Sequence, residues 1–171
     1  MKKEKFITVM ALLDDRTQQL LQQVQNDLEQ QYGTDTKTKD IPYHITLGSY
    51  PVEQTDEVVS QIIAVAERSE NFPVKLNGLG HFGNTVRYID PEINEELKEL
   101  HMHFDSDYAN GYSEWVPHIT VYRHSEPAEI ELSEQITEKL GQLKEAVIVG
   151  IELGEFFPAK KIIRVLLGGI G

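Results

Sequence analysis

Apolar and polar positions along the chain form patterns that predict strands and amphipathic helices in one order, twice over. The apolar run 6–13, which is rich in strand-forming residues, predicts a buried strand at the start. Similar runs predict strands over 41–50, 72–79, 85–90, 116–122, 147–156 and 161–167. Each half of the chain therefore reads roughly as strand, helix, strand, helix, strand.

Apolar side chains recur at helical spacing in four segments between these strands, so four helices are expected to pack one face on a core. The stripes are Leu20, Leu21, Val24 and Leu28; Val58, Val59, Ile62, Ile63 and Ala66; Ile93, Leu97, Leu100 and Phe104; and Ile136, Leu140 and Leu143. Asp14 or Asp15 is expected to cap the first helix and Gly33 to end it. The third helix is expected to begin at Pro91, and Ser133 is expected to cap the fourth.

Two short motifs recur along the chain, and in both cases the copies are separated by 74 residues. His-Ile-Thr-Leu at 44–47 returns as His-Ile-Thr-Val at 118–121, and Leu-Gly-His-Phe at 79–82 returns as Leu-Gly-Glu-Phe at 153–156. One such match is weak, but two that share an offset indicate an internal duplication. No segment rich in glycine, proline or serine separates the halves. We therefore predict one bilobal α+β domain over 1–171, with two mainly antiparallel sheets, flanking helices and a central cleft.

The His-x-Thr motif places one imidazole and one hydroxyl on the same face of a strand. Because successive side chains point to opposite faces, His44 and Thr46 share one face while their apolar neighbours enter the core. His118 and Thr120 do the same in the second copy. Near neutral pH one imidazole can accept a proton while the other donates one, and the hydroxyls can bind phosphate oxygens. This pattern predicts that both histidines are catalytic and both threonines bind phosphate, with no metal and no other cofactor.

The composition limits the kinds of site and partner that are compatible with this chemistry. Asp and Glu total 28 against 16 Lys and Arg, so the net charge is −12, and the chain contains no cysteine. Disulfides, thiolate metal sites and cysteine nucleophiles are therefore excluded. The acidity argues against an extended nucleic-acid-binding surface, yet it leaves room for a local site that takes a nucleotide or an RNA end. No apolar run is long enough to cross a membrane and no signal-like segment follows the N-terminus, so we expect a soluble cytoplasmic protein of open oligomeric state.

The paired motif resembles the signature of the 2H phosphoesterases, also called the 2'-5' RNA ligase/cyclic phosphodiesterase superfamily. The resemblance rests on residues 44–47, 117–121 and the two Leu-Gly-x-Phe segments, and it covers essentially the whole chain. It implies a bilobal fold with a central cleft and metal-independent hydrolysis or formation of phosphodiesters at a ribose 2' position. Family substrates include 2',3'-cyclic phosphates, 2'-5' linkages and ADP-ribose cyclic phosphate. The family's motif residues correspond here to His44, Thr46, His118 and Thr120.

Four more residues next to the motifs are candidates for substrate binding. Tyr43 and Trp115 lie at loop–strand junctions, where a ring can stack on a base. Tyr122 shares the face of His118 under strict alternation, although a plain role on the sheet surface suits it equally. Many relatives carry an arginine shortly after the second motif, as Arg123 stands here. Strict alternation places Arg123 on the face opposite His118 unless the strand bulges or ends there.

Other readings of the same residues stay open. The chain can be a non-catalytic nucleotide-binding module that uses the same cleft, or a metal hydrolase in which His44 and His118 hold the ion. Two intact motifs favour the metal-independent enzyme. His101 and His103 are not expected to bind a metal together, because residues two apart on a helix do not share a face.

Overall fold

The computed structural model describes residues 5–32, 41–82, 86–106, 115–123, 130–141, 143–156 and 159–168, with the backbone alone at 32, 123 and 130–133. Its helices and strands follow the order that the sequence predicts. They are β1 (Phe6–Leu13), α1 (Asp15–Tyr32), β2 (His44–Pro51), a short 3-10 helix (Val52–Gln54), α2 (Thr55–Glu67), β3 (Phe72–Phe82), β4 (Val86–Pro91), α3 (Glu95–Met102), β5 (Ile119–Arg123), α4 (Ile130–Leu140), β6 (Glu145–Phe156) and β7 (Lys160–Leu166). None of the described helices is long and apolar enough to cross a lipid bilayer.

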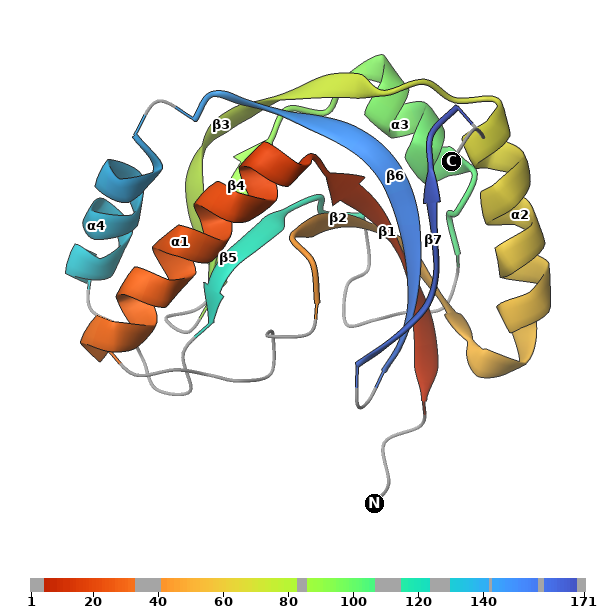
Figure 1. Ribbon diagram of the computed structural model, residues 1–171, viewed down its shortest axis with the longest axis horizontal. Helices are drawn as coiled ribbons and strands as arrows, with labels where there is room; N and C mark the ends of the chain where they lie inside the picture. Colours follow the sequence, from red (N-terminus) through yellow and green to blue (C-terminus); the bar gives the residue numbers. More distant parts are fainter. Residues whose placement is uncertain are drawn as a thin grey trace.

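The strands form one antiparallel path in the order β2-β1-β6-β3-β4-β5, and β7 joins this path at β6. Figure 1 shows the path bent into an arch, in which β3 and β6 form the top and β2 and β5 lie beneath. α1 and α4 pack on the side of the arch that holds β5 and β3, whereas α2 and α3 pack against β6, β7 and β2. The predicted α+β class with mainly antiparallel pairing is thus confirmed.

The strand pairing repeats at the same offset as the sequence motifs. At the top of the arch Pro73 of β3 pairs with Val147 of β6, and these two residues are 74 apart. On either side, β1 pairs with β2 and β6, and β4 pairs with β5 and β3. Each His-x-Thr strand also skips one residue against its neighbour, at Leu47 in β2 and at Val121 in β5. The two bulges are again 74 residues apart, so each half presents its His-x-Thr motif in the same setting.

One face of β1 lies in the hydrophobic core beneath the helices. Alternate side chains of this strand, from Ile7 to Leu13, are almost fully buried and belong to one cluster with Leu21, Val24 and Leu28 of α1. Burying one such side chain contributes roughly 1.5–3 kcal/mol. The periodic apolar stripe of α1 therefore fixes which face of β1 the helix covers. Thr8, Met10 and Leu12 on the opposite face are buried as well.

Asp14 joins the start of α1 to β6. Its carboxylate accepts hydrogen bonds from the hydroxyl (2.7 Å) and backbone N–H (3.3 Å) of Thr17, and from the backbone N–H of Val147 (2.9 Å). Burial raises the pKa of Asp14, but these hydrogen bonds outweigh burial and hold the pKa below its ordinary value. Asp14 rather than Asp15 therefore caps α1, and the same carboxylate ties the helix to a strand of the other half.

The third helix begins later than its sequence predicts. Asn94 is its N-cap, and the Asn94 side chain accepts a hydrogen bond from the backbone N–H of Leu97 at 2.9 Å. Pro91 instead ends β4, where it pairs with Leu76 of β3. The prediction of a helix start at Pro91 is wrong because the pairing with β3 extends the strand through this residue.

Other helix details also differ from the prediction. Ser133 lies within α4 and so does not cap it. Ile63 and Ile93 are 39% and 51% exposed and do not belong to the buried stripes. Val65 takes the place of Ile63, because the buried face of α2 is rotated toward it. The expected stop at Gly33 lies outside the described residues.

Replacement of Gly48 by alanine is expected to destabilise the fold. A Cβ there would lie 2.0 Å from the carbonyl oxygen of Phe104, a backbone atom that cannot move without shifting the segment after α3. We expect Gly48→Ala to lower the free energy of unfolding by about 1–3 kcal/mol, the usual cost of overpacking, as measured by urea denaturation. Gly154→Ala is the matched control, because its Cβ would first meet the flexible end of Met10, at 3.2 Å. Equal losses in the two variants would contradict this account.

Candidate active site

The two His-x-Thr motifs meet beneath the arch, where β2 and β5 begin (Figure 1). In both motifs the intervening apolar residues are buried, and the histidine and threonine side chains are partly exposed. Each imidazole is held in the same way: Nδ1 of His44 lies 2.7 Å from the carbonyl oxygen of Pro42, and Nδ1 of His118 lies 2.8 Å from that of Val116. Because a carbonyl can only accept, Nδ1 donates in both rings, and proton exchange with a substrate would use Nε2.

The surroundings of His44 keep its ring neutral. Burial lowers the pKa of His44 to about 4, and the charge of protonated His118 acts in the same direction, while the hydrogen bond to Pro42 acts against both. Nε2 of His44 lies 3.2 Å from Oγ1 of Thr46. At neutral pH the ring is therefore uncharged, with the lone pair of Nε2 beside the threonine hydroxyl. The charge of His118 reaches His44, since β2 and β5 contact each other.

The Leu-Gly-x-Phe motif of the first half lies beside the second His-x-Thr motif. Tyr88 of β4 pairs with Thr120, and its ring lies over Gly80, where a Cβ would come within 2.5 Å of a ring carbon. The ring of Phe82 stacks on Tyr88 with 4.5 Å between centroids. Both rings meet His118 edge-on, at centroid distances of 4.9 and 5.5 Å. This glycine thus makes room for Tyr88, and the motif phenylalanine packs against the imidazole.

A similar arrangement with other side chains lies beside the first His-x-Thr motif. Met10 of β1 pairs with Thr46, and a Cβ at Gly154 would lie 3.2 Å from the Met10 methyl group and 3.4 Å from the ring of Phe156. In each half, the motif glycine leaves space for the side chain that lies next to a motif threonine. The sequence identifies both glycine motifs but leaves this role unassigned. The two sides differ, because the residue paired with the motif threonine is Tyr88 in one half and Met10 in the other.

Trp115 and His101 connect the second half of the chain to the first motif. Nε1–H of Trp115 donates to the carbonyl oxygen of Thr46, and Nδ1–H of His101 donates to that of Leu47, both at 2.8 Å. Their rings stack with 3.8 Å between centroids and 4° between planes. The sequence predicts substrate binding for Trp115, whereas in the structure its N–H and one ring face contact the protein. Sequence reasoning missed His101, because 54 residues separate it from Leu47 and no local pattern relates them.

The ring of Tyr43 lies in the core, which corrects the expectation that it stacks on a substrate. It is 8% exposed, and its hydroxyl donates to the carbonyl oxygen of Leu21 at 3.1 Å and contacts Oε1 of Gln25. Burial raises the pKa of Tyr43 above its ordinary value, and the charge of Glu29 adds to this effect. The side-chain amide of Gln18 binds the backbone N–H and carbonyl of Tyr43, at 2.9 and 2.7 Å. Tyr43 therefore fixes the segment that leads into the first motif.

Tyr122 is also a core residue. Its side chain is 2% exposed, because the bulge at Val121 ends the strict alternation that would place it beside His118. The expected contact of Tyr122 with a substrate is corrected for this reason. Arg123 ends β5, where its backbone pairs with Val86, and its side chain lies outside the described residues.

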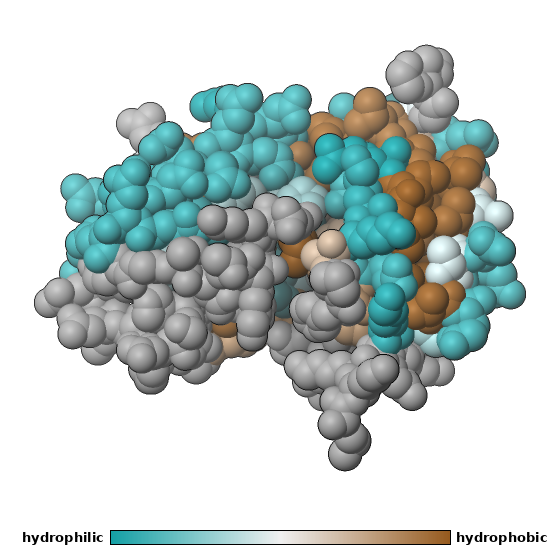
Figure 2. Space-filling model, turned by 60° about the horizontal axis from the view of Figure 1, so that its bottom comes forward, coloured by the Kyte–Doolittle hydropathy of each residue, from teal (hydrophilic) through white to brown (hydrophobic). Residues whose placement is uncertain are grey.

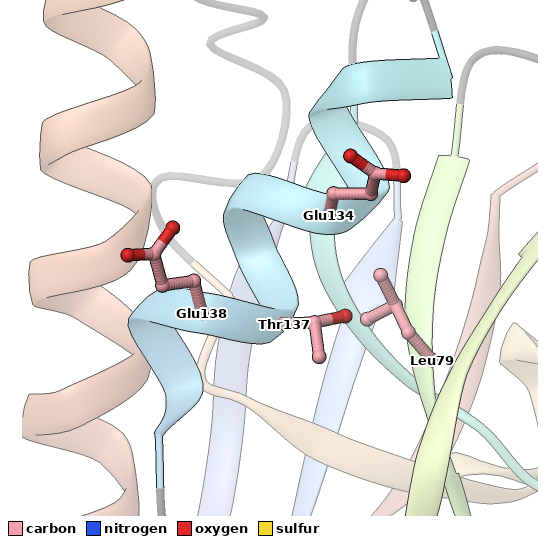
Figure 3. Close-up of a pocket in the computed structure, with 4 residues that line it drawn as sticks. All are labelled: Leu79, Glu134, Thr137 and Glu138. Carbon is pink, nitrogen blue, oxygen red and sulfur yellow. The ribbon is translucent and has the colours of Figure 1, made fainter.

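A hollow of about 450 Å³, which none of the His-x-Thr residues lines, lies between β3 and α4 (Figure 3). Leu79 and Thr137 approach each other across it, and Glu134 and Glu138 carry their carboxylates along its border. Because two carboxylates repel an anion, this hollow does not suit a phosphate despite its size.

Comparison with solved structures supports the same fold at low sequence identity. TT0787 of Thermus thermophilus superposes with a TM-score of 0.66 at 17% identity, over 97% of this chain and 100% of that one. E. coli LigT complexed with ATP gives a TM-score of 0.59 at 16% identity, over 97% and 99% of the two chains. LigT complexed with 3'-AMP gives 0.53 at 13% identity, over 96% and 99%. A comparison with curated protein sequences found no match.

The family relationship comes from the sequence model of the 2'-5' RNA ligase superfamily. This model matches residues 13–154, a range that contains both His-x-Thr motifs and most of the described elements. The match and the shared fold agree with the resemblance that the paired motifs indicate. The chain belongs to the 2'-5' RNA ligase superfamily of 2H phosphoesterases.

Proposed function

We propose that this chain is a metal-independent phosphodiesterase that acts on 2',3'-cyclic phosphates or on 2'-5'-linked nucleotides or RNA ends. The observation that carries the proposal is the identical anchoring of the two imidazoles, in which Nδ1 of His44 and of His118 donates to the carbonyl two residues earlier. This anchoring directs proton transfer at both histidines to Nε2. Membership of a phosphoesterase superfamily supports an enzyme of the phosphodiesterase or ligase type.

The pKa of His44 supports a division of roles between the histidines. Because His44 is neutral near pH 7, its Nε2 is suited to take the proton from an attacking water. The water oxygen then bonds to phosphorus, the bond to one ribose oxygen breaks, and protonated His118 gives its proton to that oxygen. The hydroxyls of Thr46 and Thr120 donate to the non-bridging oxygens as charge develops. To form a 2'-5' linkage, a 5' hydroxyl would take the place of the water, bond to the phosphorus of a 2',3'-cyclic phosphate and displace the 3' oxygen, which takes the proton from His118; the histidines exchange roles when this linkage is cleaved back to the cyclic phosphate.

The charge distribution favours a small substrate. The net charge is −12, and the exposed side of α1, which appears as a hydrophilic band in Figure 2, is rich in glutamine and has Arg16 as the only cation of the helix. A surface of this kind does not track a long phosphate backbone. LigT, which shares the fold, has been solved with ATP and with 3'-AMP. These facts support a nucleotide or an RNA end as the partner.

We further infer that residues 1–171 form a single bilobal unit built by duplication. Two motif pairs, the two bulges and the pairing of Pro73 with Val147 all share the offset of 74 residues. Because β6 pairs with both β1 and β3, the two halves share their strands.

Substitution of either motif histidine is expected to abolish most turnover. His44→Ala and His118→Ala should each lower kcat by at least about 10²-fold, the smaller effect of losing one general acid or base. The assay is hydrolysis of 2',3'-cyclic nucleotides and 2'-5' dinucleotides in the presence of a chelator, with product analysis. His103→Ala is the matched control, since this exposed histidine lies outside the motifs. Loss of wild-type activity in chelator and recovery with zinc would instead support a metal hydrolase, and nucleotide binding without turnover would support a binding module.

The acid limb of the pH profile is expected to report on His44. Because the pKa of His44 is about 4, kcat/KM should stay high from neutral pH down to about pH 5 and fall only near pH 4. An unperturbed histidine base would lose activity already near pH 6.5. A steady-state profile measured across pH 4–8 distinguishes these cases, and a fall centred at 6–7 would remove His44 from the role of a neutral base.

The same pKa couples folding to pH. The pKa of His44 is about 4 in the folded chain and about 6.5 when unfolded, so the unfolded state takes up a proton first as pH falls. The stability from this group is complete above about pH 6.5 and decreases toward pH 4, by up to about 3 kcal/mol. The free energy of unfolding of the wild type should therefore fall more steeply over this range than that of His44→Asn. Parallel curves would show that the folded chain does not hold the His44 ring neutral.

A further inference from the structure

Because of the bulge in β2, the carbonyl groups of two neighbouring residues accept hydrogen bonds from outside the sheet, on the edge away from β1. Among the described strands, β2 pairs only with β1, and Leu47 is the residue skipped in that pairing. In a regular strand, successive carbonyls point to opposite edges. The carbonyls of Thr46 and Leu47 nevertheless both accept hydrogen bonds from the second half, because the bulge interrupts this alternation.

Both bonds come from one rigid pair of rings, His101 and Trp115, which we call the clasp. The rings are stacked nearly parallel, 3.8 Å apart, and each uses a ring N–H to bind one carbonyl of the bulge. Nε2 of His101 lies 3.8 Å from Oδ1 of the exposed Asp105, a contact that is an ion pair only when the ring is protonated. The clasp thus fixes β2 to α3 and to the segment that leads into the second motif.

Hydrogen bonds and the backbone also connect the clasp to both motif histidines. Trp115 holds the carbonyl of Thr46, and Oγ1 of Thr46 lies 3.2 Å from Nε2 of His44. On its other side, Trp115 is followed directly by Val116, whose carbonyl accepts the hydrogen bond from His118. A displacement of the indole therefore changes the spacing of the two imidazoles. Since a misplacement of about 1 Å can cost roughly 10²-fold in rate, this spacing matters for catalysis.

The clasp occurs once, although the motifs that it connects occur twice. At the 74-residue offset, Ile41 corresponds to Trp115 and Asp27 corresponds to His101. Asp27 lies on α1, is a carboxylate rather than a ring, and forms an ion pair with Lys139 of α4 at 3.7 Å. The clasp is therefore not part of the repeated pattern. It is a contact that one half supplies to hold the two lobes at a defined separation.

We propose that His101 and Trp115 are positioning residues that set the separation of His44 and His118 without touching the substrate. This inference rests on the proposed function, because it concerns the geometry of the same two histidines. It also gives Trp115 a role other than stacking on a base, since one face of its ring is covered by His101 and its N–H is bonded within the protein.

Three substitutions separate the contribution of the ring stack from those of the two hydrogen bonds. Trp115→Phe keeps a ring for the stack and removes the bond to Thr46. His101→Phe keeps the stack and removes the bond to Leu47, whereas His101→Asn keeps a donor close to the position of Nδ1 and removes the stack. His103→Phe is the matched control, because this side chain is exposed one half-turn further along the same segment.

We expect Trp115→Phe and His101→Phe each to lower kcat by about 10- to 100-fold, with KM changed by less than about threefold. His101→Asn should recover part of the loss of His101→Phe. The double variant should lose less than the product of the two single effects, because both bonds hold one bulge. His103→Phe should keep wild-type kinetics. Losses no larger than in His103→Phe would overturn the proposal, and so would a rise in KM at constant kcat, which would show that Trp115 binds substrate directly.

A second readout tests the clasp independently of turnover. The imidazole signals of His44 and His118 can be followed by NMR during pH titration and during titration with inorganic phosphate. If the clasp sets the spacing, both Phe variants should raise the pKa of His44 from about 4 toward 6.5, as burial and the charge of His118 weaken. Unchanged titration curves in these variants would overturn the proposal. A wild type that turns over none of the substrates would overturn the proposed function, and the NMR titrations would still decide on the clasp.

Discussion

The pairing of β3 with β6 is the constraint on which the rest of the molecule depends. Pro73 lies opposite Val147, and the pairs on either side, Phe72 with Ile148 and Val74 with Ala146, exchange places under the same 74-residue offset. This relation sends each half of the chain away from the top of the arch along an equivalent path. Because β1 and β4 attach to these two long strands, the His-x-Thr strands attach in equivalent places. The opposition of the two motifs is thus a consequence of one strand register.

The symmetry of the backbone is broken by the side chains that surround each histidine. His44 is enclosed enough to lose its charge, whereas His118 meets Phe82 and Tyr88 at their edges. Burial disfavours the charged form of His44, so the surroundings of this ring, and not the motif itself, lower its pKa. The aromatic rings beside one motif and Met10 beside the other extend this difference to the packing around the two motifs. Under the proposed function, a duplicated scaffold would supply an acid and a base from the same residue type.

Local sequence patterns predict the strands, the helices and the inward or outward face of the motif residues, because alternation and helical period are properties of short segments. They fail where a contact with a distant segment decides. The bulge at Val121 moves Tyr122 into the core, and it exists only in relation to the pairing with β4. Tyr43 is buried because Gln18 and Gln25 of α1 reach it, which no pattern around the motif reveals. The contact of His101 with β2 depends in the same way on how α3 is placed.

The sharing of strands between the halves also has a consequence for the order in which the molecule becomes structured. β1 pairs with β6 along its length, from Phe6 opposite Phe156 to Leu13 opposite Ile148. During synthesis, β1 emerges early and β6 emerges near the end. The pairing of β1 with β6 therefore cannot form until most of the chain has been made. Pairings between such distant segments are associated with slow folding. His44 lies in the first third of the chain and belongs to β2, which pairs with β1. β1 nevertheless gains its second neighbour only after β6 has been made.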